Sequence, residues 1–235
     1  IAGWKSIDKS DMKLMPDLST TYMDPFYAEK TLCIHCDVLE PDTNEPYDRD
    51  PRGTAKKAEA YLQSSGIGDQ SFWGPEAEFF LFDDVRFSNT MNKVSFEVDA
   101  IDASWNTDTE YEMGNMGHRP GVKGGYFPVG PVDHAQDIRS EMLSTMKAIG
   151  MKVDKHHHEV ASCQHELGLV FGTLTSQADD LLKYKYVIQQ VANAYGKSAT
   201  FMPKPIAGDN GTGMHVNQSI WKDGKPLFAG DQYAD

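Results

Sequence analysis

The segment WGPEAEFFLF, residues 73–82, constrains the fold of this chain more than any other part of the sequence. Its residues are aromatic, aliphatic or small except for Glu76 and Glu78, which is typical of a buried strand with two added carboxylates. Side chains at positions i and i+2 of a strand point to one face. A buried carboxylate is costly unless it is paired or bound to a cation. The sequence therefore predicts either a basic partner or a metal ion opposite this strand.

Three further segments combine an apolar side with acid or imidazole groups on the other. They are HHHEVA with Glu159, QHELG with Glu166, and GMHVNQSIW with His215, Asn217 and Ser219 on one face. A single glutamate of this kind is more often an ion-paired or rim residue, and a lone histidine is more often a hydrogen-bonded core residue. Four such segments together favour a shared metal site. Oxygen ligands with one imidazole favour Mg²⁺ or Mn²⁺ over Zn²⁺.

Helix signals occur in three places. Asp50 as N-cap, Pro51 at the first helical position and a closing Gly66 predict the first helix. The second is expected between Asp133 as N-cap and Gly150, and the third runs from about 176 to 195, each with an apolar stripe.

Strand signals lie between these helices and after the third one, and residues 1–48 hold further short strand-like runs, among them TLCIHCDVLE. The expected later strands are 71–82, 93–100, 152–161, 164–171, 198–205 and 213–221. Strands in adjacent pairs, interrupted by helices, predict an α+β fold with a mainly antiparallel sheet and flanking helices. The change of composition near residue 48 is the candidate domain boundary, separating residues 1–48 from 49–235.

Two glycine-rich stretches are candidates for loops with a function. Residues 104–131 are weakly patterned, and loops of that length are usually functional or mobile. The turn GDNGTG, just before His215, contains Asn and Gly residues that allow positive φ and expose backbone N–H groups. By itself such a turn is as often a simple hairpin connection as a substrate cradle, but its position next to His215 favours the cradle.

Composition excludes several function classes. The chain has a formal net charge of −13, which disfavours nucleic acid and acidic membranes as partners. The sequence contains no apolar run long enough for a membrane span and no signal peptide, and three cysteines suit a reducing cytoplasm. CIHC, with Cys33 and Cys36, is interpreted as two reduced thiols on a strand, because no second such pair follows.

Taken together, these motifs resemble the glutamine synthetase family of the bacterial type. GPEAEFFLFDDVRF, KGGYFP, HHHEVA followed by QHELG, YKYVIQQVANAYGK and ATFMPKPIAGDNGTGMH match its successive signatures in order and spacing. The resemblance covers all 235 residues and identifies 1–48 as the end of a small N-terminal β-grasp-like domain. It identifies 49–235 as part of the catalytic domain.

The resemblance implies a site with two divalent metal ions, Mg²⁺ or Mn²⁺, and ATP as a substrate. It places Glu78, Glu159 and Glu166 on one metal and Glu76 and His215 on the other. The remaining implied positions are Asn210 and Gly211 at the substrate glutamate, Tyr126 near the ammonium site, Asp154, Phe171, Asn217 and Ser219 at the nucleotide, and Trp4 at a neighbouring subunit's site. Asp154 stands where Glu is frequent in the family, and Asn217 where His is.

The reaction implied is the ATP-dependent ligation of ammonia to L-glutamate through γ-glutamyl phosphate, as in nitrogen assimilation, by a cytoplasmic homo-oligomer, a dodecamer in the family. Both ends of the sequence suggest an internal piece of a longer protein. The family's arginines, flap and last metal carboxylate would follow residue 235, and an aspartate would precede residue 1. The sequence agrees, since it has five arginines and none after Arg139. We therefore expect the isolated segment to be inactive. The alternatives are a ligase for a larger amine and an inactive metal- or nucleotide-binding module.

Overall fold

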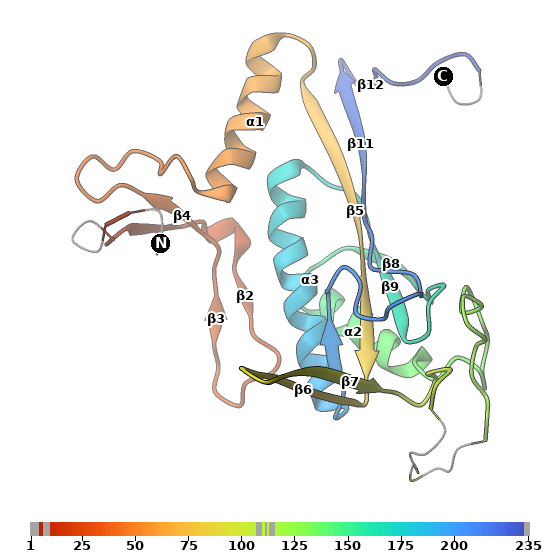
Figure 1. The fold of residues 1–235 in the computed structure, drawn as a ribbon. Coiled ribbons are helices and arrows are strands. Elements are labelled where there is room, and N and C mark those ends of the chain that lie inside the picture. Colours follow the sequence, from red (N-terminus) through yellow and green to blue (C-terminus); the bar gives the residue numbers. More distant parts are fainter. Residues whose placement is uncertain (1–4, 7–9, 107–109, 111, 113–115, 233–235) are drawn as a thin grey trace. The chain divides into compact units, whose positions relative to one another are not determined.

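The computed structural model describes residues 5–6, 10–106, 110, 112 and 116–232. The fold is α+β, as the sequence predicts, and Figure 1 labels most of its elements. In chain order they are β1 (Lys13–Pro16), the 3-10 turn η2 (Leu18–Thr20), β2 (Tyr22–Met23), β3 (Leu32–Cys33), β4 (Cys36–Leu39), α1 (Pro51–Ser65), β5 (Gln70–Phe82), β6 (Asp84–Thr90), β7 (Lys93–Asp99), α2 (Gln136–Ala148), β8 (Val153–His158), β9 (Gln164–Leu169), α3 (Leu174–Ala194), β10 (Ser198–Thr200), β11 (Met214–Lys222) and β12 (Lys225–Pro226).

The chain forms two compact units, each built from more than one stretch of sequence. Unit 1 consists of Ile1–Trp73, Phe171–Leu181 and Asn217–Asp235, and unit 2 consists of Gly74–Val170 and Leu182–Val216. The chain passes from one unit to the other within β5, α3 and β11, so these three elements contribute residues to both.

In the described part of unit 1, short antiparallel pairings join β1 to β4, β2 to β3 and the end of β11 to β12. The run TLCIHCDVLE is therefore two strands with different partners, where the sequence suggested one run. Helix α1 has the predicted boundaries. The Asp50 side chain accepts hydrogen bonds from the backbone N–H groups of Arg52 and Gly53, and Gly66 closes the helix with a φ of 72°.

Unit 2 is built around the C-terminal part of β5. Strand β9 pairs antiparallel with β5, β8 pairs antiparallel with β9, and β10 pairs antiparallel with the last residues of β5. Helix α2 packs against β8. The predicted apolar stripes are buried at Met142 and Met146 of α2 and at Ile188 and Val191 of α3. These strands and helices give the unit its core.

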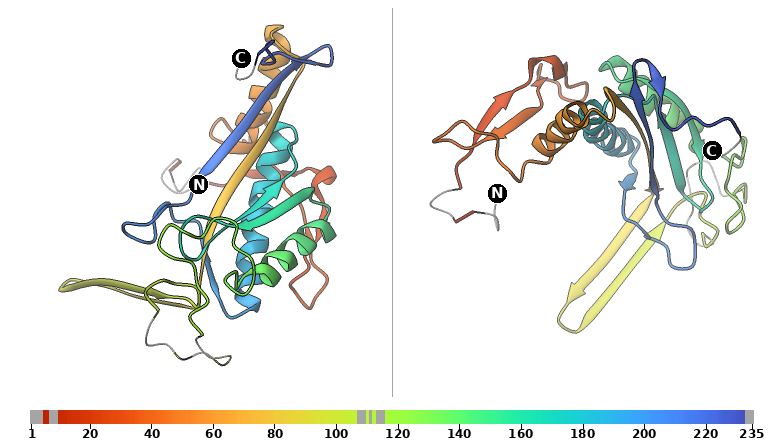
Figure 2. Two further views of the ribbon diagram at one scale, coloured as in Figure 1. Left: turned by 90° about the vertical axis from the view of Figure 1, so that its right-hand side faces the viewer. Right: turned by 90° about the horizontal axis from the view of Figure 1, so that it is seen from above.

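Two expectations about unit 2 were wrong. Asp133 is not the N-cap of α2. Ala135 occupies that position without a side-chain cap, because both Asp133 carboxylate oxygens bind Arg139 and one also accepts from the Ala135 N–H. Strand β6, which lies between the expected strands 71–82 and 93–100, was not predicted either. It pairs along its whole length with β7, and Figure 2 shows this hairpin extending away from the rest of unit 2.

Among the described residues, no helix has both the length and the apolar character that a bilayer crossing requires.

Candidate metal and substrate site

Three neighbouring strands of unit 2 bring acids and an imidazole into one row. Glu78 of β5 lies directly opposite Glu166 of β9, and Glu166 lies directly opposite His157 of β8. Residues that face each other across antiparallel strands share a face of the sheet. Glu76 lies two residues before Glu78 and points to the same face. Glu78, Glu166 and His157 therefore lie side by side on one face of the sheet, because side chains alternate between the two faces along each strand.

His157, Glu159 and Glu166 come close enough to hold one cation. Their ligand atoms all lie within 4.8 Å of one another. His157 Nε2 lies 2.8 Å from Glu159 Oε1 and 4.0 Å from Glu166 Oε2, while its buried Nδ1 has no hydrogen-bond partner among the described residues. Two carboxylates and the imidazole nitrogen Nε2 at these distances form a donor set that fits a divalent cation. Sequence reasoning missed His157, although it stands in the HHHE run that was singled out.

The electrostatics of this cluster are those of a site that is short of positive charge. Burial, reinforced by the charges of Glu76, Glu159 and Glu78, raises the pKa of Glu166 from 4.5 to about 6, against the opposing effect of His157. Burial also raises the pKa of Glu78, with a further contribution from Glu159. A bound cation would stabilise the charged carboxylates and so oppose both the effect of burial and their mutual repulsion.

Glu78 is held beside the turn that leads into β11. Its Oε2 accepts a hydrogen bond of 2.9 Å from the Gly213 N–H, and its own N–H donates to the Gly213 carbonyl at 3.2 Å. A Cβ at Gly213 would lie 3.1 Å from Glu78 Oε1 and 3.2 Å from His215 Cδ2. Glu78 and His215 therefore flank the same glycine, and a side chain at this position would press on both.

The expected substrate residues lie in the same turn of unit 2. Asn210 Oδ1 accepts a hydrogen bond of 2.8 Å from Lys123 Nζ, and the Gly211 carbonyl accepts one of 2.8 Å from Gln164 Nε2. The positive φ that was expected in this turn belongs to Gly208. Gly211 is needed for another reason, because a Cβ there would lie 2.2 Å from the Pro203 carbonyl oxygen.

The loop KGGYFP lies against the turn between β8 and β9. The Gly125 N–H donates to the Val160 carbonyl. The ring of Tyr126, which is 59% exposed, lies 5.7 Å from the ring of His157 between centroids. Phe127 stacks on His157 with centroids 4.5 Å apart and planes at 9°. Tyr126 thus borders the cluster, and Phe127, which sequence reasoning missed, fixes the imidazole plane.

Asp154 lies at the other end of β8, where the register with β9 shifts between Val153 and His156. Its side chain is exposed and approaches Gly168 so closely that a Cβ there would overlap Asp154 Oδ1, at 2.1 Å.

Three of the expected nucleotide residues belong to unit 1. Phe171, 62% exposed, packs edge-to-face on Phe72 at 5.5 Å, and Phe72 packs in the same way on Trp221 at 5.8 Å. Trp221 Nε1 donates to Ser219 Oγ at 3.0 Å. These three aromatic rings line a cavity of about 370 Å³. Asn217 lies on β11 near Ser219. Trp4 lies outside the described residues.

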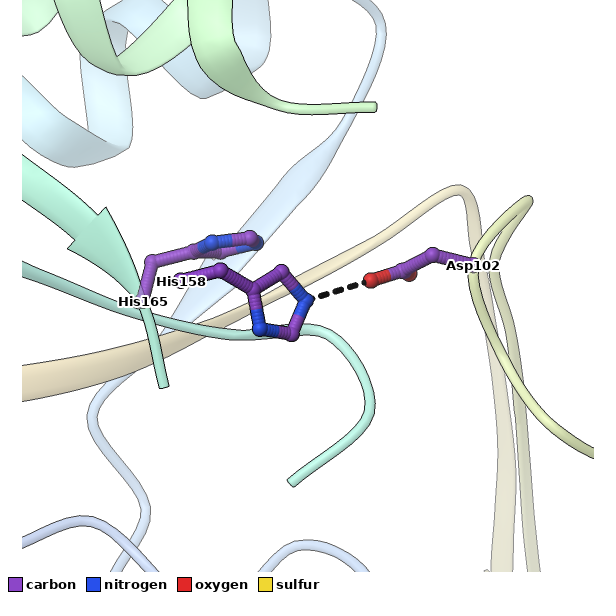
Figure 3. A group of neighbouring side chains, drawn as sticks. All are labelled: Asp102, His158 and His165. Atoms are coloured by element: carbon purple, nitrogen blue, oxygen red, sulfur yellow. Dashed lines mark hydrogen bonds and ion pairs between the residues drawn. The ribbon is translucent and has the colours of Figure 1, made fainter. Parts of the chain in front are cut away.

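A second group of ligand-type side chains occurs deeper in unit 2 (Figure 3). Asp102, His158 and His165 are all buried, and His158 Nε2 donates to Asp102 Oδ2 at 2.9 Å. Burial alone would lower the pKa of His158, but its hydrogen bond to Asp102 raises it on balance. Arg139 lies 3.1 Å from His165 Nδ1. Because the Asp102 carboxylate is already paired with His158, and Arg139 is ion-paired with Asp133, we assign no metal ion to this group.

The sequence matches two family models and several named relatives. The model of the glutamine synthetase catalytic domain matches residues 48–235, and that of the glutamine synthetase β-grasp domain matches residues 1–41. The chain is 74% identical over 235 residues to a glutamine synthetase of Rhodobacter capsulatus and 59% identical over 234 residues to one of Vibrio cholerae. It covers 53% and 50% of these two proteins, so the chain spans about half the length of the curated relatives it matches.

Solved structures have a similar fold. A cryo-EM structure of Plasmodium falciparum glutamine synthetase matches 99% of the chain with a TM-score of 0.90 at 30% identity, and 46% of that structure's chain is covered. A GmaS–ADP complex matches 97% of the chain with a TM-score of 0.73 at 25% identity, again over 46% of its own chain.

Proposed function

The chain belongs to the glutamine synthetase family, and on that premise we propose that it carries the metal-binding part of the active site of a glutamate–ammonia ligase. The enzyme would join ammonia to L-glutamate at the expense of ATP, through γ-glutamyl phosphate. The row of Glu78, Glu166 and His157 across β5, β9 and β8 is the observation that carries this proposal. Oxygen-rich clusters of this kind suit the Mg²⁺ or Mn²⁺ that phosphoryl transfer requires.

The residues of the cluster would hold two cations. Glu78, Glu159 and Glu166 are proposed as ligands of one, and Glu76 and His215 as ligands of the other. His157 is added to the first set because its ligand atom lies within 4.8 Å of those of Glu159 and Glu166. Bound divalent ions neutralise phosphate oxygens and orient the reacting groups. The protein's own part is to fix the carboxylates, which the strand pairings and the Gly213 turn do.

The substrates would meet at the rim of this cluster. Asn210 and Gly211 are proposed to bind L-glutamate, since Lys123 and Gln164 hold their turn beside Glu78. Tyr126 is proposed to border the ammonium site, where the nearby anionic carboxylates would attract a cation and accept its proton.

The nucleotide would be bound by Asp154, Phe171, Asn217 and Ser219. The exposed ring of Phe171 and its partners Phe72 and Trp221 offer apolar surface on which a flat base can stack. The likeness to the GmaS–ADP complex is consistent with an adenine nucleotide as ligand.

We also propose that residues 1–48 end the β-grasp domain, that 49–235 belong to the catalytic domain, and that the working enzyme is a cytoplasmic homo-oligomer, a dodecamer as in the family. The two family-model ranges support the division of the chain.

The test is an assay of the full-length protein with L-glutamate, ammonium, ATP and Mg²⁺ or Mn²⁺, following glutamine and phosphate release. Glutamine formation is expected, with a loss of at least about 100-fold in Glu166→Gln, because that substitution removes a charged ligand from the shared cluster. A full-length protein that folds and binds Mn²⁺ but forms no glutamine would contradict the proposal.

A further inference from the structure

Gln164 lies at a junction of three parts of unit 2. It is the first residue of β9, its side chain is buried, and only 1% of its surface is exposed. Its Oε1 accepts a hydrogen bond of 3.0 Å from the Ala161 N–H in the turn between β8 and β9. Its Nε2 donates to Glu78 Oε2 on β5 and, at 2.8 Å, to the Gly211 carbonyl.

These three partners allow only one orientation of the amide. A primary amide has one carbonyl oxygen and two N–H donors. The Ala161 N–H needs an acceptor, whereas the Glu78 carboxylate and the Gly211 carbonyl both need donors. Rotating the amide by half a turn would place its oxygen against two other oxygens and leave the Ala161 N–H facing a donor. The side chain is therefore fully used and fixed.

The contacts of Gln164 fix the orientation of Glu78. Both the Gln164 amide and the Gly213 N–H donate to the same oxygen, Oε2, so the carboxylate plane is set by two donors from different segments. The backbone of Gln164 adds a link to a second acid, since its carbonyl accepts a hydrogen bond of 2.7 Å from the Glu159 N–H. Groups that orient metal ligands in this way typically change metal affinity or activity 10–100-fold when they are removed.

We propose that Gln164 is a positioning residue that couples the metal cluster to the substrate turn: one donor of its amide sets the Glu78 carboxylate, and the other sets the Gly211 carbonyl. This inference rests on the proposed function, because it takes Glu78 as a metal ligand and Gly211 as a glutamate-binding residue. Metal binding and glutamate binding then depend on one side chain. Losing it impairs both at once.

The test begins with Gln164→Met in the full-length protein, which keeps an unbranched side chain of similar size but removes all three hydrogen bonds. Mn²⁺ affinity, measured by calorimetry without nucleotide or glutamate, is expected to fall about ten-fold or more. The KM for L-glutamate is expected to rise by more than kcat falls, because the Gly211 carbonyl is no longer held. Gln189→Met, the same change at an exposed position of α3, is the control and is expected to behave as wild type.

A double-mutant cycle separates positioning from a general loosening of the fold. If Gln164 acts through Glu78, the effect of Gln164→Met on Mn²⁺ affinity largely disappears in a Glu78→Gln background. If the Met variant does not fold, Gln164→Asn gives the same comparison, since its shorter amide cannot span from Ala161 to Glu78 and Gly211.

Two results would overturn this inference and leave the proposed function standing. One is wild-type Mn²⁺ affinity in a folded Gln164 variant. The other is a decrease in Mn²⁺ affinity by Gln164→Met that is equally large in the Glu78→Gln background. A wild-type protein that binds no Mn²⁺ would overturn the proposed function and this inference with it.

Discussion

Glu166 lies where the charges of Glu76, Glu78, Glu159 and His157 all affect its pKa. It faces Glu78 on one side and His157 on the other, and its pKa of about 6 reflects burial together with the charges of Glu76, Glu159 and Glu78. Near neutral pH the metal-free protein must keep this carboxylate ionised against its surroundings. The structure thus stores an unfavourable interaction that cation binding relieves.

The first prediction concerns pH and the stability of the metal-free protein. Because the pKa of Glu166 is raised from 4.5 to about 6, the folded state holds its proton over a range in which the unfolded state has lost it. The free energy of unfolding should therefore decrease as pH rises from about 4.5 through 6. Urea unfolding in the presence of a chelator measures this. Glu166→Gln should flatten the slope, and Mn²⁺ should restore stability above pH 6. An unchanged slope in Glu166→Gln would show that other groups cause it.

The second prediction concerns Gly211. In Gly211→Ala the new Cβ would overlap the Pro203 carbonyl oxygen, at 2.2 Å, so the turn must move. We expect the KM for L-glutamate to rise at least about ten-fold, since small displacements of binding groups have large effects. Gly121→Ala is the matched control, because a Cβ there meets no atom within 4 Å in the described part of the chain. Equal kinetics for the two variants would remove Gly211 from the substrate site.

At the scale of elements, Tyr184 of α3 separates two strands at the site. Its hydroxyl donates to the Ala77 carbonyl of β5 at 2.6 Å and accepts from the Leu167 N–H of β9 at 3.2 Å. The pairing of β5 with β9 ends at Glu78 and Glu166, and Ala77 and Leu167 would form the next pair in this register. The phenol thus takes the place of a ladder hydrogen bond and holds the strands apart where the acids gather.

The third prediction tests whether the Tyr184 hydroxyl keeps β5 and β9 apart. Tyr184→Phe leaves the Ala77 carbonyl and the Leu167 N–H without the hydroxyl, and we expect a loss of about 1–3 kcal/mol in the free energy of unfolding. Mn²⁺ affinity should also fall, because the strands that carry Glu78 and Glu166 can close. Tyr195→Phe, at the exposed end of the same helix, should change neither. Full Mn²⁺ affinity in Tyr184→Phe would show that the strand separation does not depend on the phenol.

An element can be predicted from the sequence when the residues that determine it lie within or beside it, and not when they lie elsewhere in the chain. Helix α1 is correct at both ends because Asp50 and Gly66 carry their signals locally. The prediction of Asp133 as the N-cap of α2 was wrong. Arg139, six residues further along, binds the Asp133 carboxylate, which the local pattern had assigned to capping. Strand β6 was missed because its strand character comes from pairing with β7.

The candidate site shows the same limit. Glu76, Glu78, Glu159 and Glu166 stand out in the sequence because acids interrupt apolar strands. His157 and Gln164 do not, since their contacts arise only from the register of β8, β9 and β5. A histidine and an amide next to an expected ligand have no local signal that separates them from ordinary polar residues.

At the scale of the molecule, unit 1 is assembled from three separate stretches of chain, and Arg52 joins two of them. Its guanidinium donates to Asp17 and Asp37 and, at 3.0 Å, to Asp179 at the start of α3. The hydrogen bond from Ser19 and then those from Arg52 lower the pKa of Asp17. One side chain near the start of α1 therefore fastens the β1–β4 region to a segment more than a hundred residues further along.

The fourth prediction follows from this junction. Arg52→Gln leaves three carboxylates without their shared cation, so the free energy of unfolding should fall by about 2 kcal/mol or more. Because the hydrogen bond from Ser19 and those from Arg52 hold the pKa of Asp17 below its ordinary value of 3.8, the stabilisation that the Arg52 contacts contribute is present above that pH and is lost as pH falls. The difference between variant and wild type, measured by urea unfolding, should shrink in acid. A constant difference at all pH values would contradict this.

The proposed metal site is tested most directly by Mn²⁺ calorimetry on the full-length protein near pH 7.5, comparing wild type with Glu166→Gln and with Glu97→Gln. Glu97 is an exposed acid on β7 of the same unit and serves as the matched control. We expect saturable Mn²⁺ binding in wild type and in Glu97→Gln, and an affinity at least about ten-fold weaker in Glu166→Gln. Equal affinities in all three folded proteins, or no binding in wild type, would contradict the assignment of this strand row as a metal site.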